Sequence, residues 1–257
     1  MKVNQRRRQI LSIIRENEDI AVEDLSHRFS VSESTIRRDL KCLADENLIR
    51  RNRGGASTLY QFDFELPILT RTQIMRIEKE AVGRLAATLI EEGDTIFLSG
   101  GTTTKEVARN LTNIRRITVV TSAINIINYL VNFPDITVIV PGGTLVPKHL
   151  TLVGDISKYT LDRLRIDKVF LGVSAIDIDQ GITSESLEDA VTDRNIANIA
   201  RKLIVVTDSS KFGIVRTALI TPVEEVDFII TDTRIAVSDV DRIRQLGVEI
   251  ILASLEK

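Results

Sequence analysis

Residues 20–40 constrain this chain more than any other stretch, because they predict two short helices joined by a tight turn. Apolar residues recur at the spacing of one helical face in the range 22–29 and again in the range 36–43. The turn lies at residues 30–32, and the Ser32 hydroxyl is suited to accept a backbone N–H at the start of the second helix. The other face of that helix is polar and basic. The stretch therefore predicts a helix-turn-helix whose second helix enters the major groove of DNA.

A basic turn follows the second helix. Residues 47–56 predict a strand, a glycine turn and a returning strand, which together would form a wing beside the helix-turn-helix. Arginines of the wing would contact phosphates, whereas side chains of the second helix would approach base edges. The alternative is that these arginines form a solvated charged face. Because helix, turn, capped helix and basic wing coincide, we favour DNA binding, by Ser32, Ser34, Thr35, Arg37, Arg38, Arg50, Arg51 and Arg53.

The net charge of −2 conceals an asymmetry between the two parts of the chain. Of the 34 Lys and Arg and the 36 Asp and Glu residues, residues 1–57 hold 12 and 9, which gives +3 there and −5 in the remainder. A basic small end joined to an acidic body suits a protein that contacts phosphates with one domain only.

Composition excludes several classes of protein. No run of about 18 apolar residues predicts a membrane span, and the basic start lacks the apolar core of a secretion signal. The single cysteine, Cys42, cannot form an internal disulfide and fits a reducing compartment, so we expect a cytoplasmic protein. Cys42, His27 and His149 are too few for a structural zinc finger, and neither histidine stands in a catalytic-triad motif. We expect both histidines to be ordinary polar residues, with no metal site and no cofactor.

Residues 58–73 predict a linker between two domains, 1–57 and 74–257. The segment contains Tyr60, Phe62, Phe64 and Pro67 without a regular period, so we expect it to pack across the join between the domains. Residues 74–91 predict an amphipathic helix that ends at Gly93. Its expected apolar face comprises Ile77, Ala81, Leu85, Thr88 and Leu89.

From Asp94 onward, apolar runs alternate with helical stretches. Continuous apolar strands that alternate with helices predict a parallel sheet covered on both faces, which is a Rossmann-like α/β domain. The expected strands are 95–98, 117–120, 136–140, 168–173, 203–207, 228–231 and 248–252, with helices at 105–111 and 124–131.

Glycine and polar residues follow these strands, at the edge where open α/β sheets bind ligands. Residues 99–104 are the clearest case, because glycines admit a close backbone approach and a helix N-terminus favours an anion. The loop matches neither the dinucleotide fingerprint nor a P-loop. The alternatives are a tight strand-to-helix turn here and a simple surface lysine at Lys211. We expect an effector with a phosphate or carboxylate, bound by Ser99, Gly100, Gly101, Thr102, Thr103, Thr104, Thr121, Ser122, Gly142, Gly143 and Lys211.

Motifs in both parts of the chain resemble the DeoR-type bacterial transcriptional regulators. The run Thr35-Ile36-Arg37-Arg38-Asp39-Leu40 carries the resemblance in the first domain. Gly101-Thr102-Thr103, Pro141-Gly142-Gly143 and Asp208-Ser209-Ser210-Lys211 carry it in the second. The resemblance implies a sensor domain similar in fold to ribose-5-phosphate isomerase. It further implies a repressor of carbohydrate genes that releases DNA when a phosphorylated sugar binds.

The chain departs from that family pattern at several positions. The family commonly has His at position 53, Asp at 99, Asn at 122 and Gly at 175, where this chain has Arg53, Ser99, Ser122 and Ala175. A Lys-Arg pair typical of the family is Thr192-Asp193 here. These departures alter the charges and hydroxyls available to a ligand, so the identity of the sugar stays open.

The leading hypothesis is a ligand-responsive repressor that binds operator DNA as a homo-oligomer, either a dimer or a tetramer. The rival is a sugar-phosphate isomerase fused to a DNA-binding head. Isomerases of this fold carry an acid and a lysine after the glycine turn, whereas residues 181–187 offer Glu185 without an adjacent lysine. A purely architectural DNA-binding protein would not need glycine loops at the strand ends.

Overall fold

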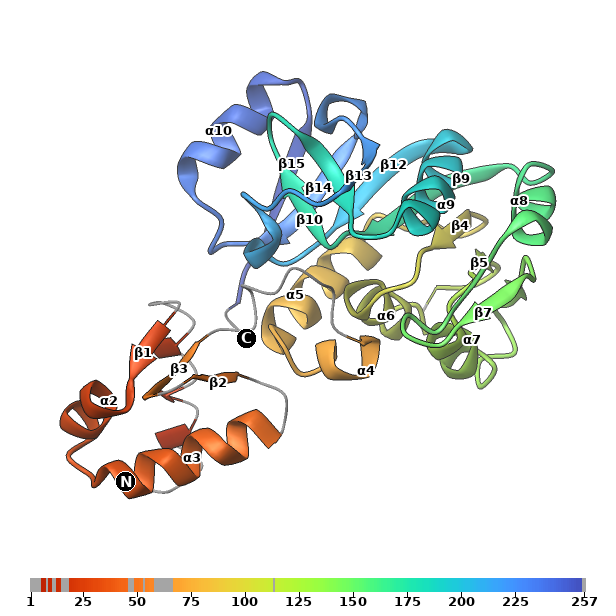
Figure 1. The fold of residues 1–257 in the computed structure, drawn as a ribbon. Helices are drawn as coiled ribbons and strands as arrows, with labels where there is room; N and C mark the ends of the chain where they lie inside the picture. The colour runs from red at the N-terminus through yellow and green to blue at the C-terminus, as the bar shows by residue number, and fades with distance from the viewer. Residues whose placement is uncertain are drawn as a thin grey trace. The chain divides into compact units, whose positions relative to one another are not determined.

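The computed structural model describes residues 6–7, 9–10, 13–14, 19–45, 49–52, 54–57, 67–112 and 114–255. The chain divides into two compact units, Met1–Glu65 and Leu66–Lys257 (Figure 1). The expected α/β class is confirmed, with a winged helix-turn-helix followed by a parallel-sheet domain.

The first unit combines a helix-turn-helix with a small antiparallel sheet. Its helices are α2 (Val22–Phe29) and α3 (Glu33–Asp45), which match the two expected helices. Strands β2 (Arg50–Asn52) and β3 (Gly55–Ser57) form the wing, and β3 also pairs with β1 (Asp19–Ala21). The sequence analysis did not expect β1. A β-carbon on Gly55 would lie 2.3 Å from the Ile20 carbonyl oxygen, so this pairing requires glycine there.

The second unit is built on a seven-stranded sheet in which all neighbouring strands are parallel. The strand order is β15-β14-β12-β9-β4-β5-β6. Every expected strand is present, with bounds β4 (Thr95–Leu98), β5 (Thr118–Val120), β6 (Thr137–Ile139), β9 (Ile166–Gly172), β12 (Ala200–Val206), β14 (Phe228–Asp232) and β15 (Glu249–Ala253).

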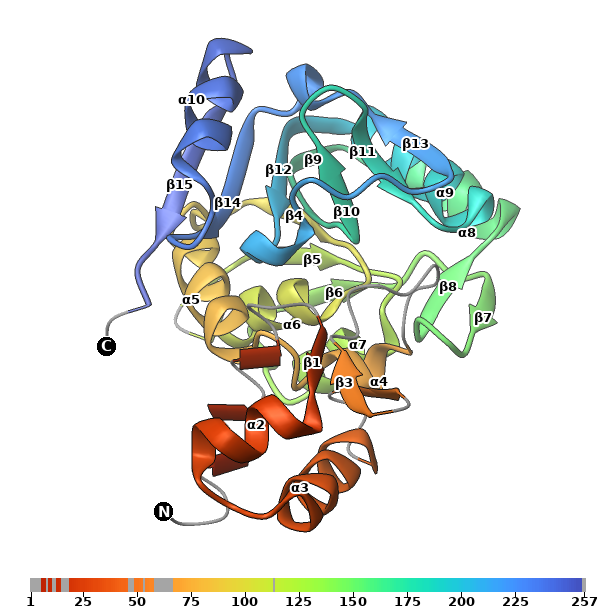
Figure 2. The same ribbon diagram turned by 60° about the vertical axis from the view of Figure 1, so that its left-hand side comes forward.

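Helices cover both faces of this sheet (Figure 2). Successive side chains of each strand point to opposite faces, so one strand contributes residues to two buried clusters. Ile96, Leu98 and Phe170 belong to one buried cluster, which includes residues of three helices, α5 (Arg76–Ala87), α6 (Thr102–Arg109) and α7 (Ile124–Leu130). Phe97 and Val169 belong to the other cluster, on the face covered by α8 (Asp155–Leu161), α9 (Leu187–Asn198) and α10 (Val237–Gln245).

Two small sheets accompany the main one. Strands β10 (Ala175–Asp177), β11 (Gly181–Ser184) and β13 (Ala218–Thr221) form an antiparallel sheet over the second face. Strands β7 (Thr144–Val146) and β8 (Thr151–Val153) form a hairpin beside β6. Short 3₁₀ turns occur at Ser209–Lys211 (η2) and Val223–Glu225 (η3). The sequence analysis did not expect the strands of these two small sheets.

The start of the second unit differs from expectation in two respects. A short helix, α4 (Ile68–Arg71), occupies part of the segment 58–73 that was expected to be a linker; residues 58–66 lie outside the described part of the chain. Helix α5 begins at Arg76, and its buried face includes Val82 and Ala86. The expected apolar face was wrong in part, because Ile77 is 61% exposed and Thr88 is also exposed. The buried face instead includes Lys79, which the sequence analysis did not assign to it because the side chain is charged.

Candidate DNA-binding surface and effector site

The turn between α2 and α3 has a defined backbone geometry. Ser30 adopts the left-handed conformation with a φ of 51°, and its N–H donates to the His27 carbonyl. The Ser32 hydroxyl accepts the Thr35 backbone N–H at 3.3 Å, as expected for a residue that caps a helix. The sequence therefore fixes the direction in which α3 leaves the turn.

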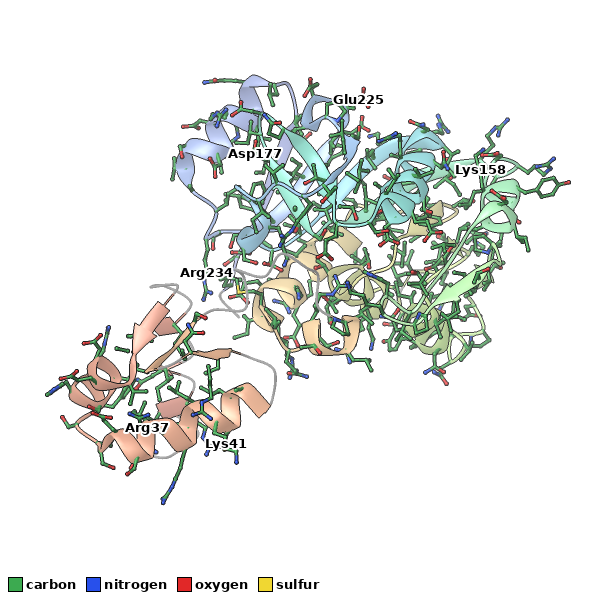
Figure 3. All side chains as sticks on the ribbon, viewed as in Figure 1. Arg37, Lys41, Lys158, Asp177, Glu225 and Arg234 are labelled. Carbon is green, nitrogen blue, oxygen red and sulfur yellow. The ribbon has the colours of Figure 1, made fainter. Side chains whose placement is uncertain are left out.

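Helix α3 exposes a polar and basic face. Ser34, Arg37, Arg38 and Lys41 are exposed, whereas Thr35 is half-buried. Figure 3 labels Arg37 and Lys41 on this helix. The Arg37 guanidinium donates to the Glu33 carboxylate at 2.8 Å, one helical turn earlier. A DNA phosphate would therefore compete with Glu33 for Arg37, whereas no such ion pair is described for Arg38.

Asp39 lies on the opposite side of α3 and has a structural role. It is 2% exposed, and its carboxylate accepts from Arg6 Nε at 2.6 Å and from Arg7 Nε at 2.9 Å. Asp39, the acidic residue of the motif at 35–40, thus holds the N-terminal segment onto α3. Two of the basic residues at the start of the chain therefore form ion pairs within the first unit.

The structure describes the wing arginines to different extents. Arg51 is exposed on β2 and is available to a phosphate backbone. Arg50 is also on β2, and Arg53 lies outside the described residues.

The expected effector residues cluster at the carboxyl edge of the main sheet. The loop after β4 begins at Ser99, and Thr102–Thr104 form the first turn of α6. Thr121 and Ser122 follow β5, the neighbour of β4. All the hydroxyl-bearing side chains of this group are 7% exposed or less. The structure therefore brings together residues that the sequence separates by about twenty positions.

Two of these hydroxyls hold the strand ends together. Ser99 Oγ accepts the Gly172 N–H at 2.9 Å and so joins the loops after β4 and β9. Thr121 Oγ1 donates to the Leu98 carbonyl at 2.7 Å and accepts the Ala123 N–H at 3.2 Å. These side chains position the loops, and the Thr121 hydroxyl already uses its one donor.

Thr104 and Ser122 differ from Ser99 and Thr121. Their hydroxyl oxygens are buried, and neither has a hydrogen-bond partner within the described part of the chain. The N-cap of α6, Gly101, provides no side chain to bind the first backbone N–H groups of the helix. Unpaired buried hydroxyls beside a helix N-terminus form an arrangement that can bind an anion or a sugar hydroxyl.

The two glycines after β6 have a different place. A β-carbon on Gly143 would lie 2.4 Å from the Val153 carbonyl oxygen, and one on Gly142 would lie 3.3 Å from the Ile156 side chain. These contacts place Gly142 and Gly143 against β8 and α8, where they shape the β7–β8 hairpin.

That hairpin reaches the loop after β4. A β-carbon on Gly100 would lie 2.2 Å from the Thr151 methyl group, so Thr151 covers Gly100 directly. Backbone bonds from Ile124 N–H to Leu150 and from Leu152 N–H to Ser122 attach the hairpin to the loop after β5.

A charged group lies on the other side of β4, after β12. Lys211 ends η2, and Asp208 precedes it with 1% exposure. Lys79 Nζ from α5 lies 4.0 Å from Asp208 Oδ2 and donates to the Arg71 carbonyl at 3.0 Å. Burial lowers the pKa of the Lys79 ammonium from 10.5 to about 8; Asp208 opposes this shift, and the charges of Lys211 and Arg71 add to it.

Sequence reasoning missed Lys79 because it stands between two glutamates and looked like part of a solvated face. The available signal was its spacing, since Lys79 shares a helical face with Val82 and Ala86. Sequence reasoning also found no lysine adjacent to Glu185, whereas the structure places Lys148 Nζ 3.4 Å from the Glu185 carboxylate.

Other features of the second unit lie away from this edge. A hollow of about 250 Å³ is lined by residues that precede β5 and β6, at the amino edge of the sheet: Thr112, Ile114, Arg115, Phe133, Pro134, Asp135 and Ile136. Within the described residues, no group of three or more His, Cys, Asp or Glu side chains is placed to hold a metal ion. None of the helices that the structure describes is long and apolar enough to cross a membrane.

Comparison with known proteins identifies the family. The profile of the DeoR C terminal sensor domain matches residues 75–233, and that of the DeoR-like helix-turn-helix domain matches residues 6–62. The chain belongs to the DeoR family. The glycerol-3-phosphate regulon repressor of Escherichia coli strain K12 is 34% identical to it over 234 residues, which cover 90% of this chain and 92% of the relative.

Other DeoR-family relatives extend over nearly the whole chain. The transcriptional regulator GolR of Listeria innocua is 30% identical over 250 residues, which cover 97% of this chain and 98% of GolR. The regulator GlpR of Haloferax volcanii is 32% identical over 248 residues and covers 96% of both chains. The named activity of these relatives is transcriptional regulation, and this chain is a member of the same family of DNA-binding regulators.

Similarity to solved structures is weaker. A D-ribose-5-phosphate isomerase in complex with phospho-erythronic acid aligns over 55% of each chain with 18% identity and a TM-score of 0.41. The translation initiation factor eIF-2B of Pyrococcus horikoshii aligns over 63% of this chain and 64% of its own, with 15% identity and a TM-score of 0.42. Scores of this size support no conclusion about function, and the fold class rests on the sheet of the chain itself.

Proposed function

We propose that this DeoR-family protein represses carbohydrate-metabolism genes and that a phosphorylated sugar or a related small anion releases it from operator DNA. The observation that carries the effector half of the proposal is the pair of buried, unpartnered hydroxyls of Thr104 and Ser122 beside the N-terminus of α6. A phosphate bound there would receive backbone N–H groups of the first helical turn and hydrogen bonds from both hydroxyls.

The residues around this centre take different roles in the proposal. Thr102, Thr103 and Gly101 supply backbone groups, and Gly100 permits close approach. Lys211 supplies positive charge from the loop after β12, and Lys79 supplies it from α5, opposite Asp208 of that loop. Ser99 and Thr121 keep the loops in place. Gly142 and Gly143 act indirectly, through the hairpin that covers Gly100.

The DNA half of the proposal rests on α3 and the wing. Ser34, Arg37 and Arg38 approach base edges from the exposed face of α3, and the arginines at positions 50, 51 and 53 contact phosphates. Ser32 and Thr35 fix the start of α3. Helix-turn-helix repressors bind two half-sites as dimers, so we propose a homo-oligomer acting on DNA in the cytoplasm.

Fluorescence anisotropy tests this function directly. The full chain is titrated onto a duplex from the region upstream of its own gene and onto a scrambled duplex, each with and without glycerol 3-phosphate, fructose 6-phosphate and inorganic phosphate. We expect tighter binding to the upstream duplex and about 5- to 150-fold weaker binding with an active sugar phosphate. Equal binding to both duplexes would contradict the proposed role as a repressor. Unchanged binding with every compound in a wide sugar-phosphate panel would contradict the proposed release by an effector.

One observation favours a second activity. Lys148 lies beside Glu185, which supplies the lysine that an isomerase site requires. Turnover of ribose 5-phosphate by the full chain, lost in Glu185→Gln, would support an enzyme. The family relatives named as regulators favour repression without turnover.

A further inference from the structure

Helix α4 occupies a notable position in the second unit. It spans only Ile68–Arg71 and follows directly, in the sequence, on the segment that joins the two units. Ile68 is buried, whereas Leu69 is 74% exposed. One hydrogen bond attaches the start of this helix to the turn of the β7–β8 hairpin, and another attaches its end to Lys79 of α5, which faces the loop after β12.

The first attachment holds the start of α4. The Ile68 N–H donates to the Lys148 carbonyl at 3.0 Å, in the turn of the β7–β8 hairpin. Three residues later in the hairpin, the Thr151 methyl group covers Gly100. A β-carbon on Gly100 would lie 2.2 Å from that methyl group, so a ligand group that enters above Gly100 must displace Thr151. A displacement of Thr151 would move the hairpin whose turn contains Lys148.

The hairpin already shows a constrained backbone at this point. Leu150 has a φ of 53°, a conformation that costs free energy in a residue other than glycine. It lies between Lys148, which accepts from α4, and Thr151, which covers Gly100. Its carbonyl accepts the Ile124 N–H, which anchors the hairpin to the loop after β5.

The second attachment holds the end of α4. The Lys79 ammonium donates to the Arg71 carbonyl at 3.0 Å and faces the Asp208 carboxylate at 4.0 Å. The loop of Asp208 continues into Lys211, the cation expected to bind the effector. Lys79 is 5% exposed, so an anion bound by this loop attracts the Lys79 ammonium with little screening by water. Such an anion would draw the Lys79 ammonium toward the loop and lengthen its bond to the Arg71 carbonyl.

We propose that α4 is the element that couples effector binding to DNA binding, and that Lys79 is the positioning residue at its end. The structure contains both attachments, and in this proposal the effector loosens both of them. This inference rests on the proposed repressor function, because it assigns the route by which that function is regulated.

The test uses variants that break one attachment each, with matched controls, in the full chain. Lys79→Met removes the ammonium and keeps the length of the side chain, and Arg76→Met removes an exposed cation from the same helix as its control. Ile68→Pro removes the N–H that binds Lys148, at a first helical position that tolerates proline. Ile68→Ala is its control, because it also shortens the side chain but keeps the N–H.

Operator affinity is first measured without ligand, by anisotropy on the upstream and scrambled duplexes. Loss of an attachment should have the same effect as effector binding. We therefore expect Lys79→Met and Ile68→Pro to bind the upstream duplex at least about fivefold more weakly than their controls. Binding to the scrambled duplex stays equal in all four variants. Amide hydrogen exchange confirms that β9 and β12 remain protected and that residues 68–75 exchange faster only in the two broken variants.

The second measurement repeats the titration with glycerol 3-phosphate, or with any sugar phosphate that releases the wild type. We expect both broken variants to respond less than about twofold while the controls keep the full response. If both broken variants match their controls in affinity and in response, α4 is not the coupling element. If the wild type itself does not distinguish the two duplexes, the repressor function has failed, which is a different result from a failure of coupling alone.

Discussion

Arg38 is the residue of α3 from which we expect the largest contribution to operator recognition. It is exposed, whereas its neighbour Arg37 already pairs with Glu33. An arginine that bridges a guanine provides about 1–3 kcal/mol of discrimination, so Arg38→Ala should weaken binding to the upstream duplex by that amount. Titration by anisotropy measures the change.

A matched control for Arg38 lies on the preceding helix. Arg28 is an exposed arginine of α2, outside the face expected to read bases. Arg28→Ala should lower the affinity for upstream and scrambled duplexes to the same small extent. Unchanged discrimination between the two duplexes in Arg38→Ala would remove Arg38 from the set of base-reading residues.

Asp39 makes a different contribution, to the stability of the first unit. Its carboxylate is 2% exposed and binds Arg6 and Arg7. Asp39→Asn leaves two guanidinium groups without a counter-charge in a largely buried position, which should destabilise the unit by about 3 kcal/mol. Hydrogen exchange of α3 amides in the full chain measures this, and exchange in β12 serves as the internal control. Equal protection of α3 in both proteins would contradict the role.

Lys79 should make stability depend on pH in the alkaline range. Burial lowers the pKa of its ammonium to about 8 in the folded protein, against 10.5 as the ordinary value. Between pH 8 and 10.5, the Lys79 side chain is mostly neutral in the folded protein and mostly protonated in the unfolded chain. Because the unfolded chain binds more protons in this range, the free energy of unfolding rises with pH between about 8 and 10.5. Relative to Lys79→Met, the wild type should gain about 2 kcal/mol from pH 7.5 to 9.5.

Urea unfolding of both proteins at the two pH values measures this difference. The Met variant carries all other lysines and tyrosines, so their titration cancels in the comparison. A constant difference between the two proteins would show that the Lys79 ammonium titrates at its ordinary pKa.

Single residues also show where prediction from sequence stops. Ser32 could be identified as a helix cap because capping depends on local sequence. The partners of Lys79 could not, since Asp208 lies 129 positions away and its proximity depends on the order of the strands. Likewise, Lys148 comes beside Glu185 only through the path of the hairpin.

At the level of elements, the strands of the main sheet could be predicted, whereas the strands of the two small sheets that accompany it could not. A strand segment buried on both faces, such as residues 203–206 of β12, is a continuous apolar run in the sequence. The β7–β8 hairpin has partly exposed strands of three residues, whose pattern is no stronger than that of a loop. The hairpin nevertheless covers the proposed effector site, so the undetected elements are the ones that complete it.

The contact between the β7–β8 hairpin and the loop after β4 gives a prediction in which a second substitution compensates the first. Gly100→Ala places a methyl group 2.2 Å from the Thr151 methyl, which is closer than atoms can approach, and should destabilise the second unit by about 1–3 kcal/mol. Adding Thr151→Ser removes the opposing methyl group and should restore most of the loss. Urea unfolding of the wild type, both single variants and the double variant measures the coupling. Additive effects of the two substitutions would contradict the contact.

At the level of the whole molecule, the distribution of charge divides the work between the two units. Residues 1–57 carry a net charge of +3, and the remainder carries −5. DNA phosphates therefore attract the first unit and repel the second, so nearly all counterion release should come from the helix-turn-helix and its wing. The salt dependence of binding then reports how many helix-turn-helix units, one from each copy of the chain and here called heads, are bound to the DNA.

This gives a prediction for the effector-bound state. If the effector displaces one head of a dimer from its half-site, the slope of log affinity against log salt concentration should fall by about half, because half the phosphate contacts are lost. Anisotropy between about 50 and 200 mM salt, with and without the active sugar phosphate, measures both slopes. A weaker affinity with an unchanged slope would mean that both heads remain bound and that the effector acts on base contacts within each head.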